Sequence, residues 1–136
     1  MEERFFKKIT IRPESMNTDK FSDDTFGKAL RRYIDDECIK LIDFAVYVGV
    51  NKSTLSRYIK GRYIPETKTL MRICIVLHLY PERSAYLFEL CGHVLGNSKL
   101  HHLYKAILAD VFLNRRTIKD YNEFLKENGV DESDLL

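Results

Sequence analysis

The chain has 136 residues, of which 45% are hydrophobic and 31% charged, so it can bury a core without disulfides or metal. Its formal net charge of +2 is too small to argue for or against a nucleic-acid partner. Its apolar runs are too short to cross a bilayer, and residues 1–14 contain acids where a secretion signal would be apolar. We therefore expect a cytoplasmic protein without a membrane partner, built as one domain or as one small domain with an appendage.

Residues 1–21 are expected to form an N-terminal arm or a short strand. Ile9 and Ile11 alternate with polar neighbours, which is typical of an extended segment. The cations of this segment would allow it to lie on DNA, whereas Phe5 and Phe6 would fasten it to the core. We favour fastening to the core, because so short an alternation is weak evidence for any special role.

The first predicted helix begins after Ser22 or Asp24, either of which can cap it, and ends near Glu37. Its apolar residues recur at the spacing of one helix face. They are Phe26, Leu30, Tyr33 and Ile34.

The stretch from Leu41 to Gly61 predicts two helices joined by a tight turn. The first helix ends at Val48, and Gly49 supplies the positive φ that so sharp a reversal needs. Asn51 caps the second helix, which runs from Lys52 to Lys60. The inward positions of this stretch are Phe44, Ala45, Val48, Val50, Leu55, Tyr58 and Ile59. Small Ala45 would let the two helices cross closely.

The outward face of the second helix carries three cations, two hydroxyls and no acid. Its residues are Lys52, Ser53, Ser56, Arg57 and Lys60. Between Asn51 and Arg72 there are six cations against the single acid Glu66, whereas acids outnumber cations by one from His93 onward. A helix of this shape and charge fits the major groove of duplex DNA. A merely solvated face is the alternative, which we consider weaker because the basic face coincides with the turn geometry.

With Ala45, Gly49, Leu55, Gly61 and Pro65 at these spacings, followed by an apolar helical stripe, residues 25–92 resemble the Cro and phage-repressor helix-turn-helix family. The resemblance implies a five-helix DNA-binding core. Members usually have a capping Ser or Thr followed by a phosphate-contacting polar residue where this chain has Lys40 and Leu41. They usually have glycine where Cys38 stands.

The rest of the core is expected to contain two more helices, from Thr67 and from Pro81 to about Gly92. Leu70, Ile73, Cys74 and Leu77 would face inward from the first of these and Ala85, Leu87, Phe88 and Cys91 from the second. Arg72 is expected to point away from the core.

Residues 98–128 predict two further helices, capped by Ser98 and Thr117, and the acidic tail after them is expected to fray. The first of the two has apolar residues at spacings of three and four throughout. These are Leu100, Leu103, Tyr104, Ile107, Leu108, Val111 and Phe112. Together with the second helix they exceed what a closed five-helix core needs, which favours a homodimer through residues 98–128. Thickening of a monomer's core is nearly as good an explanation.

Catalytic or metal-binding patterns are absent from the sequence. Cys91, His93, His101 and His102 lack the spacing of a zinc site, and no glycine-rich phosphate loop or nucleophile motif occurs. The three cysteines are far apart and indicate reduced structural thiols. We therefore expect no enzyme activity, no cofactor and no metal.

The sequence thus predicts an all-α fold in three parts: an arm at 1–21, a helix-turn-helix domain at 22–96 and a two-helix extension at 97–136. The predicted function is sequence-dependent binding of double-stranded DNA by a transcription regulator of repressor-like type. Lys52, Ser53 and Arg57 would lie nearest the bases, and Ser56, Lys60, Arg62 and Lys68 nearest the phosphates. The alternative, which Lys40 and Leu41 favour slightly, is a helical interaction module or antitoxin-like regulator that works through its C-terminal helices.

Overall fold

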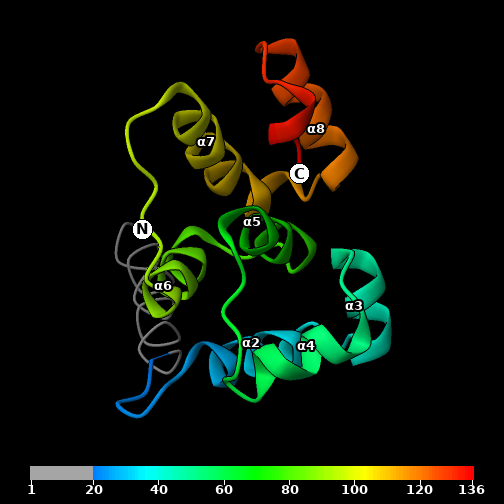
Figure 1. The fold of residues 1–136 in the computed structure, drawn as a ribbon, viewed down its shortest axis with the longest axis vertical. Helices are drawn as coiled ribbons and strands as arrows, with labels where there is room; N and C mark the ends of the chain where they lie inside the picture. The colour runs from blue at the N-terminus through cyan, green and yellow to red at the C-terminus, as the bar shows by residue number, and fades with distance from the viewer. Residues whose placement is uncertain (1–19) are drawn as a thin grey trace, which may run out of the picture.

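The computed structural model describes residues 20–136 (Figure 1), so the predicted arm lies almost wholly outside the described residues. The described part contains seven α-helices and one 3-10 turn, and no strand, which confirms the all-α prediction. The α-helices are α2 (Phe26–Asp36), α3 (Leu41–Val48), α4 (Lys52–Ile59), α5 (Thr67–Val76), α6 (Pro81–Cys91), α7 (Lys99–Asn114) and α8 (Ile118–Glu127). The 3-10 turn is η1 (Glu132–Asp134).

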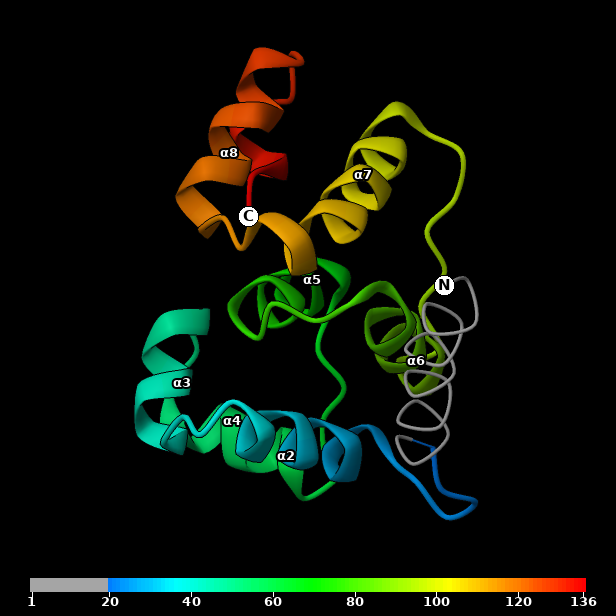
Figure 2. The same ribbon diagram turned by 180° about the vertical axis from the view of Figure 1, so that it is seen from behind.

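Helix α5 lies at the centre of the molecule. Figures 1 and 2 show it with α2 and α4 on one side and α7 and α8 on the other. It packs against α3, α6, α7 and α8. Its side chains are buried around most of the helix, including Leu70, Met71, Ile73, Cys74 and Ile75. A helix that is apolar on nearly all sides must be surrounded, and this requirement gathers the other helices around α5.

The predicted caps of three helices are confirmed, and that of α2 is wrong. The side chains of Asn51, Ser98 and Thr117 accept hydrogen bonds from the first turns of α4, α7 and α8. Helix α2 is capped by Thr25, whose hydroxyl accepts from the amide of Lys28 at 3.2 Å.

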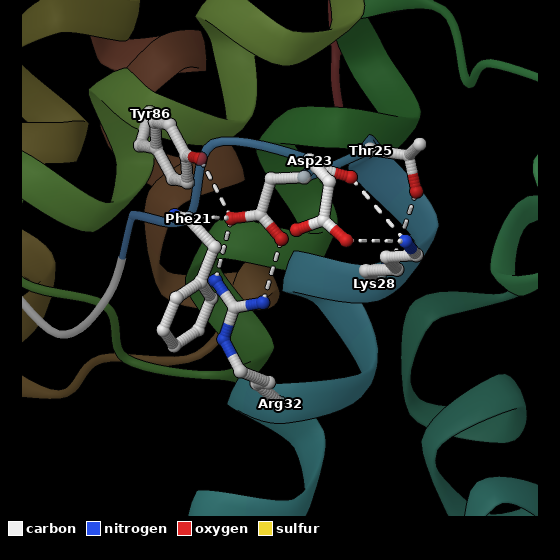
Figure 3. Close-up of polar contacts among 7 residues, drawn as sticks. Phe21, Asp23, Thr25, Lys28, Arg32 and Tyr86 are labelled. Carbon is white, nitrogen blue, oxygen red and sulfur yellow. Dashed lines mark hydrogen bonds and ion pairs between the residues drawn. The ribbon is translucent and has the colours of Figure 1, made fainter.

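Asp24 fastens the segment before α2 onto α6 instead of capping the helix. Its partners Arg32 and Tyr86 point toward each other in Figure 3. Its carboxylate accepts two hydrogen bonds from the guanidinium of Arg32, at 2.7 and 2.8 Å, and one from the Tyr86 hydroxyl at 2.6 Å. The Arg32 guanidinium also stacks on the ring of Phe21 at 4.5 Å. The Asp24 side chain is only 2% exposed and that of Arg32 is 29% exposed, so the carboxylate of this ion pair is buried and its guanidinium partly so.

The C-terminal tail is docked, so the expectation that it frays is wrong. The Asn122 side chain bonds both the backbone N–H and the carbonyl of Leu136, at 2.7 and 2.8 Å. The Tyr104 hydroxyl donates to the Asp134 carbonyl at 3.0 Å, and the Lys68 amine donates to the Ser133 carbonyl. Three helices thus satisfy the backbone of the tail, which a charge pattern alone does not reveal.

Two predicted orientations also need correction. Ala85 is exposed, and Ser84 and Tyr86 are buried in its place, because α6 turns that face toward α2 and Asp24. Arg72 does not point away: its guanidinium donates to the carbonyl of Val48 at 2.8 Å. That carbonyl ends α3, where helix carbonyls lack intrahelical partners and attract cations.

The Asp24 ion pair predicts a defined dependence of stability on pH. Hydrogen bonding from Arg32 lowers the pKa of Asp24 from 3.8 to about 2, although burial opposes the shift. The charged carboxylate therefore stabilises the fold above pH 4, and this contribution is lost as the pH falls toward 2. Asp24→Asn should lower the free energy of unfolding by about 2 kcal/mol at pH 7, and the difference should shrink below pH 4.

Urea denaturation at several pH values measures this difference. Asp23→Asn is the matched control, since Asp23 is 79% exposed and, among residues 20–136, forms its ion pair with Lys28 at the surface. It should change the free energy of unfolding by less than about 0.5 kcal/mol at any pH. Equal effects of the two variants would show that the buried pair contributes nothing specific.

Candidate nucleic-acid interface

The turn between α3 and α4 has the predicted geometry. Gly49 adopts φ of +87°, and its amide donates to the carbonyl of Ala45 at 2.9 Å. The amide of Val50 donates to the same carbonyl at 3.0 Å, which closes the end of α3. The side-chain oxygen of Asn51 then accepts from the amide of Thr54 at 2.7 Å and from the Ser53 hydroxyl at 2.8 Å. The start of α4 is therefore fixed by its cap.

The inward face of the two helices is also as predicted. Phe44, Ala45 and Val48 of α3 are buried, as are Leu55 and Tyr58 of α4, while Val50 and Ile59 are partly buried against the core. The ring of Tyr58 meets that of Phe26 edge to face, with centroids 6.3 Å apart. Helix α4 is thereby anchored to the core by one face, and its opposite face points toward solvent.

Gly27 of α2 permits the closest helix contact at this site, and sequence reasoning missed it. A Cβ atom added at Gly27 would lie 2.2 Å from the carbonyl oxygen of Ile59 and 2.5 Å from that of Tyr58. The last turn of α4 therefore rests directly on the backbone of α2. A glycine inside a predicted helix is a signal for such a contact, although it does not identify the partner.

The outward face of α4 brings together the five residues predicted for it. Lys52, Ser53, Arg57 and Lys60 are exposed and Ser56 is half-buried. Lys52, Ser56 and Lys60 line one edge of a groove of about 280 Å³, which Ile42 of α3 and Arg31 of α2 also line. Arg31 was not predicted; it adds a cation to this face and pairs with Asp35 at 3.3 Å. In the sequence, Arg31 could have been identified as a basic residue at an outward position of the predicted helix.

Tyr63 stands beside Arg57 on the other edge of α4. The loop after α4 folds back, with the amides of Arg62 and Tyr63 donating to the carbonyl of Arg57 at 2.9 and 3.4 Å. The guanidinium of Arg57 lies 5.5 Å from the centre of the Tyr63 ring, a cation–π contact. Tyr63 is 53% exposed and was not predicted as a site residue. Arg62 is exposed in the same loop.

Lys68 is placed differently from the other predicted site residues. It lies half-buried in the first turn of α5, and its amine is bound to the carbonyl of Ser133 in the tail. The charge of Lys68 is therefore already engaged within the molecule.

Helix α3 exposes three large apolar side chains and one acid, Asp43. Lys40 makes no side-chain cap, and Leu41 is half-buried. Ile42, Val46 and Tyr47 are 52%, 72% and 59% exposed, so much of the outward surface of α3 is apolar. The turn before it contains Cys38 at φ of +57°, the left-handed conformation that glycine adopts freely.

Two of the histidines make contacts within the fold. The His93 ring contacts the carbonyl of Pro65 at 2.7 Å, and Nδ1 of His101 accepts from the amide of Gly96 at 2.7 Å. Within residues 20–136, no group of three or more His, Cys, Asp or Glu side chains is arranged to hold a metal ion.

Comparison with known proteins identifies the class of this site. Residues 39–83 match the family model described as "Helix-turn-helix", of the Cro/C1 type. The match runs from the turn before α3 into the first turn of α6 and contains both motif helices. Residues 39–83 are therefore similar to the helix-turn-helix of the XRE family, which is a DNA-binding regulatory domain. No curated protein and no solved structure matches the chain. Among the described helices, none is long and apolar enough to span a membrane.

The contact at Gly27 predicts that even one methyl group there is costly. Gly27→Ala places Cβ against the carbonyls of Tyr58 and Ile59, so α2 and α4 must separate. We expect the free energy of unfolding to fall by about 1–3 kcal/mol, as for other overpacked sites, and the melting temperature to fall with it. Thermal unfolding followed by circular dichroism measures the effect.

Gly96→Ala is the matched control, because an added Cβ there would lie 3.6 Å from the His101 ring, an ordinary contact. Its melting temperature should stay close to that of the parent chain. If Gly27→Ala were equally harmless, the close approach of α2 and α4 would not determine the position of α4.

Proposed function

We propose that this protein is a transcription regulator that binds double-stranded DNA in a sequence-dependent manner, with α4 in the major groove. The observation that carries the proposal is the acid-free outward face of α4, with Lys52, Arg57 and Lys60 on a helix anchored by its other face. Such a helix matches the width of the major groove and the charge of the phosphates. The proposal includes no enzymatic activity and no cofactor, and it puts the protein in the cytoplasm.

The residues on the outward face of α4 divide by position into those that would read bases and those that would bind phosphates. Lys52, Ser53 and Arg57 would lie nearest the base edges, and Ser56 and Lys60 nearest a phosphate. Arg62 would assist from the following loop. Lys68 would contact DNA only after releasing the Ser133 carbonyl, so we expect it to contribute the least of these residues to DNA binding.

We also propose that the protein works as a homodimer, because one core contacts only a few base pairs and useful specificity normally needs two half-sites. Tyr104, Ile107 and Val111 of α7 are buried within the chain, so the apolar surplus is smaller than the sequence indicated. Support comes instead from an apolar groove between α6 and α7, at whose edge Val94 is 85% exposed.

A helical interaction module remains the second candidate function. The exposed apolar side chains of α3 favour it, because a phosphate-binding helix does not need Ile42, Val46 and Tyr47 at its surface. An antitoxin-like regulator would combine this protein-binding surface with the DNA-binding face of α4.

Titration of a fluorescent random-sequence duplex, followed by anisotropy at low and high salt, tests DNA binding. We expect binding at low salt and weaker binding at high salt. A plot of the logarithm of the association constant against the logarithm of the salt concentration should have a slope of about −0.9 for each phosphate neutralised. Absence of binding at 50 mM salt would support the interaction module instead.

The division of labour on α4 can be tested with two variants on a selected operator. Arg57→Ala should cost about 1–3 kcal/mol and relax specificity at one base position. Lys60→Ala should weaken binding to all sequences alike and reduce the salt slope by about one unit. Competition binding with single-base operator variants measures both effects. Equal losses on every sequence for both variants would make Arg57 a phosphate contact.

The dimer proposal predicts that a charge at Val94 separates the protomers. Val94→Asp should shift sedimentation toward the monomer and weaken operator binding, without lowering the melting temperature, since this side chain is 85% exposed. Leu113→Asp is the matched control, because Leu113 is 78% exposed near the end of α7 and does not line the α6–α7 groove. Monomeric sedimentation of the parent chain at operator-binding concentrations would contradict the proposal.

A further inference from the structure

A third groove lies where the helix-turn-helix meets the C-terminal extension. Its volume is about 580 Å³, within the range of pockets that bind small molecules. The apolar lining comes from Ile39, Tyr47, Val76 and Ile118. Arg115 lies in the turn between α7 and α8, and Lys119 lies in the first turn of α8. The walls therefore come from α3, α5 and α8, which belong to both parts of the chain.

The charged side chains of this groove are mostly basic. Arg115, Arg116 and Lys119 line it against the single acid Glu37. Arg115 pairs with Glu37 at 3.7 Å, a long contact between two walls, and Arg116 turns to Asp110 at 3.1 Å. Among residues 20–136, the side-chain amine of Lys119 makes no hydrogen bond or ion pair, although, after the hydrogen bonds from Thr117, its charge also helps to lower the pKa of the neighbouring Asp120. An entering anion would thus meet one free cation and one that is weakly held.

Unusual backbone conformations gather at the same groove. In the described part of the chain, three non-glycine residues have positive φ: Cys38 at +57°, His78 at +49° and Arg115 at +50°. His78 and Arg115 line the groove, and Cys38 lies between two residues that do. Strained backbone of this kind concentrates at ligand-binding sites.

His78 adds an unsatisfied polar group to the lining. Its Nδ1 is buried and has no hydrogen-bond partner among the described residues. Burial, followed by the charge of Arg115, lowers the pKa of His78 below its ordinary value of 6.5, so the ring is neutral at pH 7. A neutral imidazole loses less hydration than an imidazolium would when the apolar part of a ligand covers it.

We propose that this groove binds a small organic anion with an aromatic or branched apolar body, its charge held by Lys119 and Arg115. The apolar lining would bury the body, and the few convergent cations would fix its orientation, as in ligand pockets generally. An acidic peptide is the competing occupant. The proposal goes beyond DNA binding, and its test needs no DNA, so either can fail without the other.

Three probes of matched shape separate charge from apolar burial: 4-phenylbutyrate, the neutral 4-phenylbutyramide and the cationic 4-phenylbutylamine. Each is titrated into the full-length, nitrogen-15-labelled protein and followed by amide chemical shifts. We expect saturable shifts at Val76, Arg115 and Ile118 with 4-phenylbutyrate. Its dissociation constant should be about tenfold lower than that of the amide, the effect of one charge-assisted contact, and the amine should bind most weakly.

Two lysines on α8 supply matched variants. Lys119→Glu should raise the dissociation constant for 4-phenylbutyrate by about tenfold or more, because it reverses the free charge at the groove. Lys126 is an exposed lysine in the last turn of α8 and does not line the groove. Lys126→Glu should therefore leave the dissociation constant for 4-phenylbutyrate unchanged. Both positions are exposed, so unchanged melting temperatures check that the fold is intact.

Equal affinities for acid and amide would overturn the proposal, as would shifts that map to the α6–α7 groove around Phe88 and Val94. Failure of 4-phenylbutyrate to bind at millimolar concentration would overturn it too. Shifts of the groove amides that arise only with a synthetic peptide of alternating Glu and Leu would replace the small anion by an acidic polypeptide.

Discussion

The contact between the last turn of α4 and the backbone of α2 at Gly27 is the constraint on which the rest of the site depends. It leaves no room for a side chain, so α4 can rest there in only one position. The Asn51 cap fixes the other end of the same helix, and Leu55 and Tyr58 hold its inner face. With both ends and one face determined, the basic side chains of α4 must project outward together.

The C-terminal extension is integrated with this core rather than appended to it. Helix α7 packs on α5 and α6, helix α8 packs on α5, and the tail returns to Lys68 in the first turn of α5 (Figures 1 and 2). Arg72, one turn further along α5, holds the carbonyl end of α3. Helix α5 therefore connects the extension physically to the helix-turn-helix, and the groove at Tyr47, Val76 and Ile118 lies along this connection.

Local patterns predicted most of the fold and the main face of the site. Apolar periodicity and the caps at Asn51, Ser98 and Thr117 set the helices, because both signals lie within a few residues of the structure they specify. Contacts between distant residues could not be read in this way. The local pattern predicts a helix cap at Asp24, because its actual partner Tyr86 lies 62 residues away and cannot be recognised from neighbouring residues. The same pattern predicts a frayed tail, because the partners of the tail lie on other helices. Tyr63 and Arg31 join the site only through the folded chain.

Selection of operators from a random duplex library by the full-length protein tests the central claim most directly. If α4 reads bases from paired protomers, successive rounds should enrich one motif with two inverted half-sites about 10 base pairs apart, centre to centre. The same selection with Arg57→Ala should yield a motif that is degenerate at one position in each half-site. If the bound pool stayed random in sequence through all rounds, sequence-dependent recognition by α4 would be refuted.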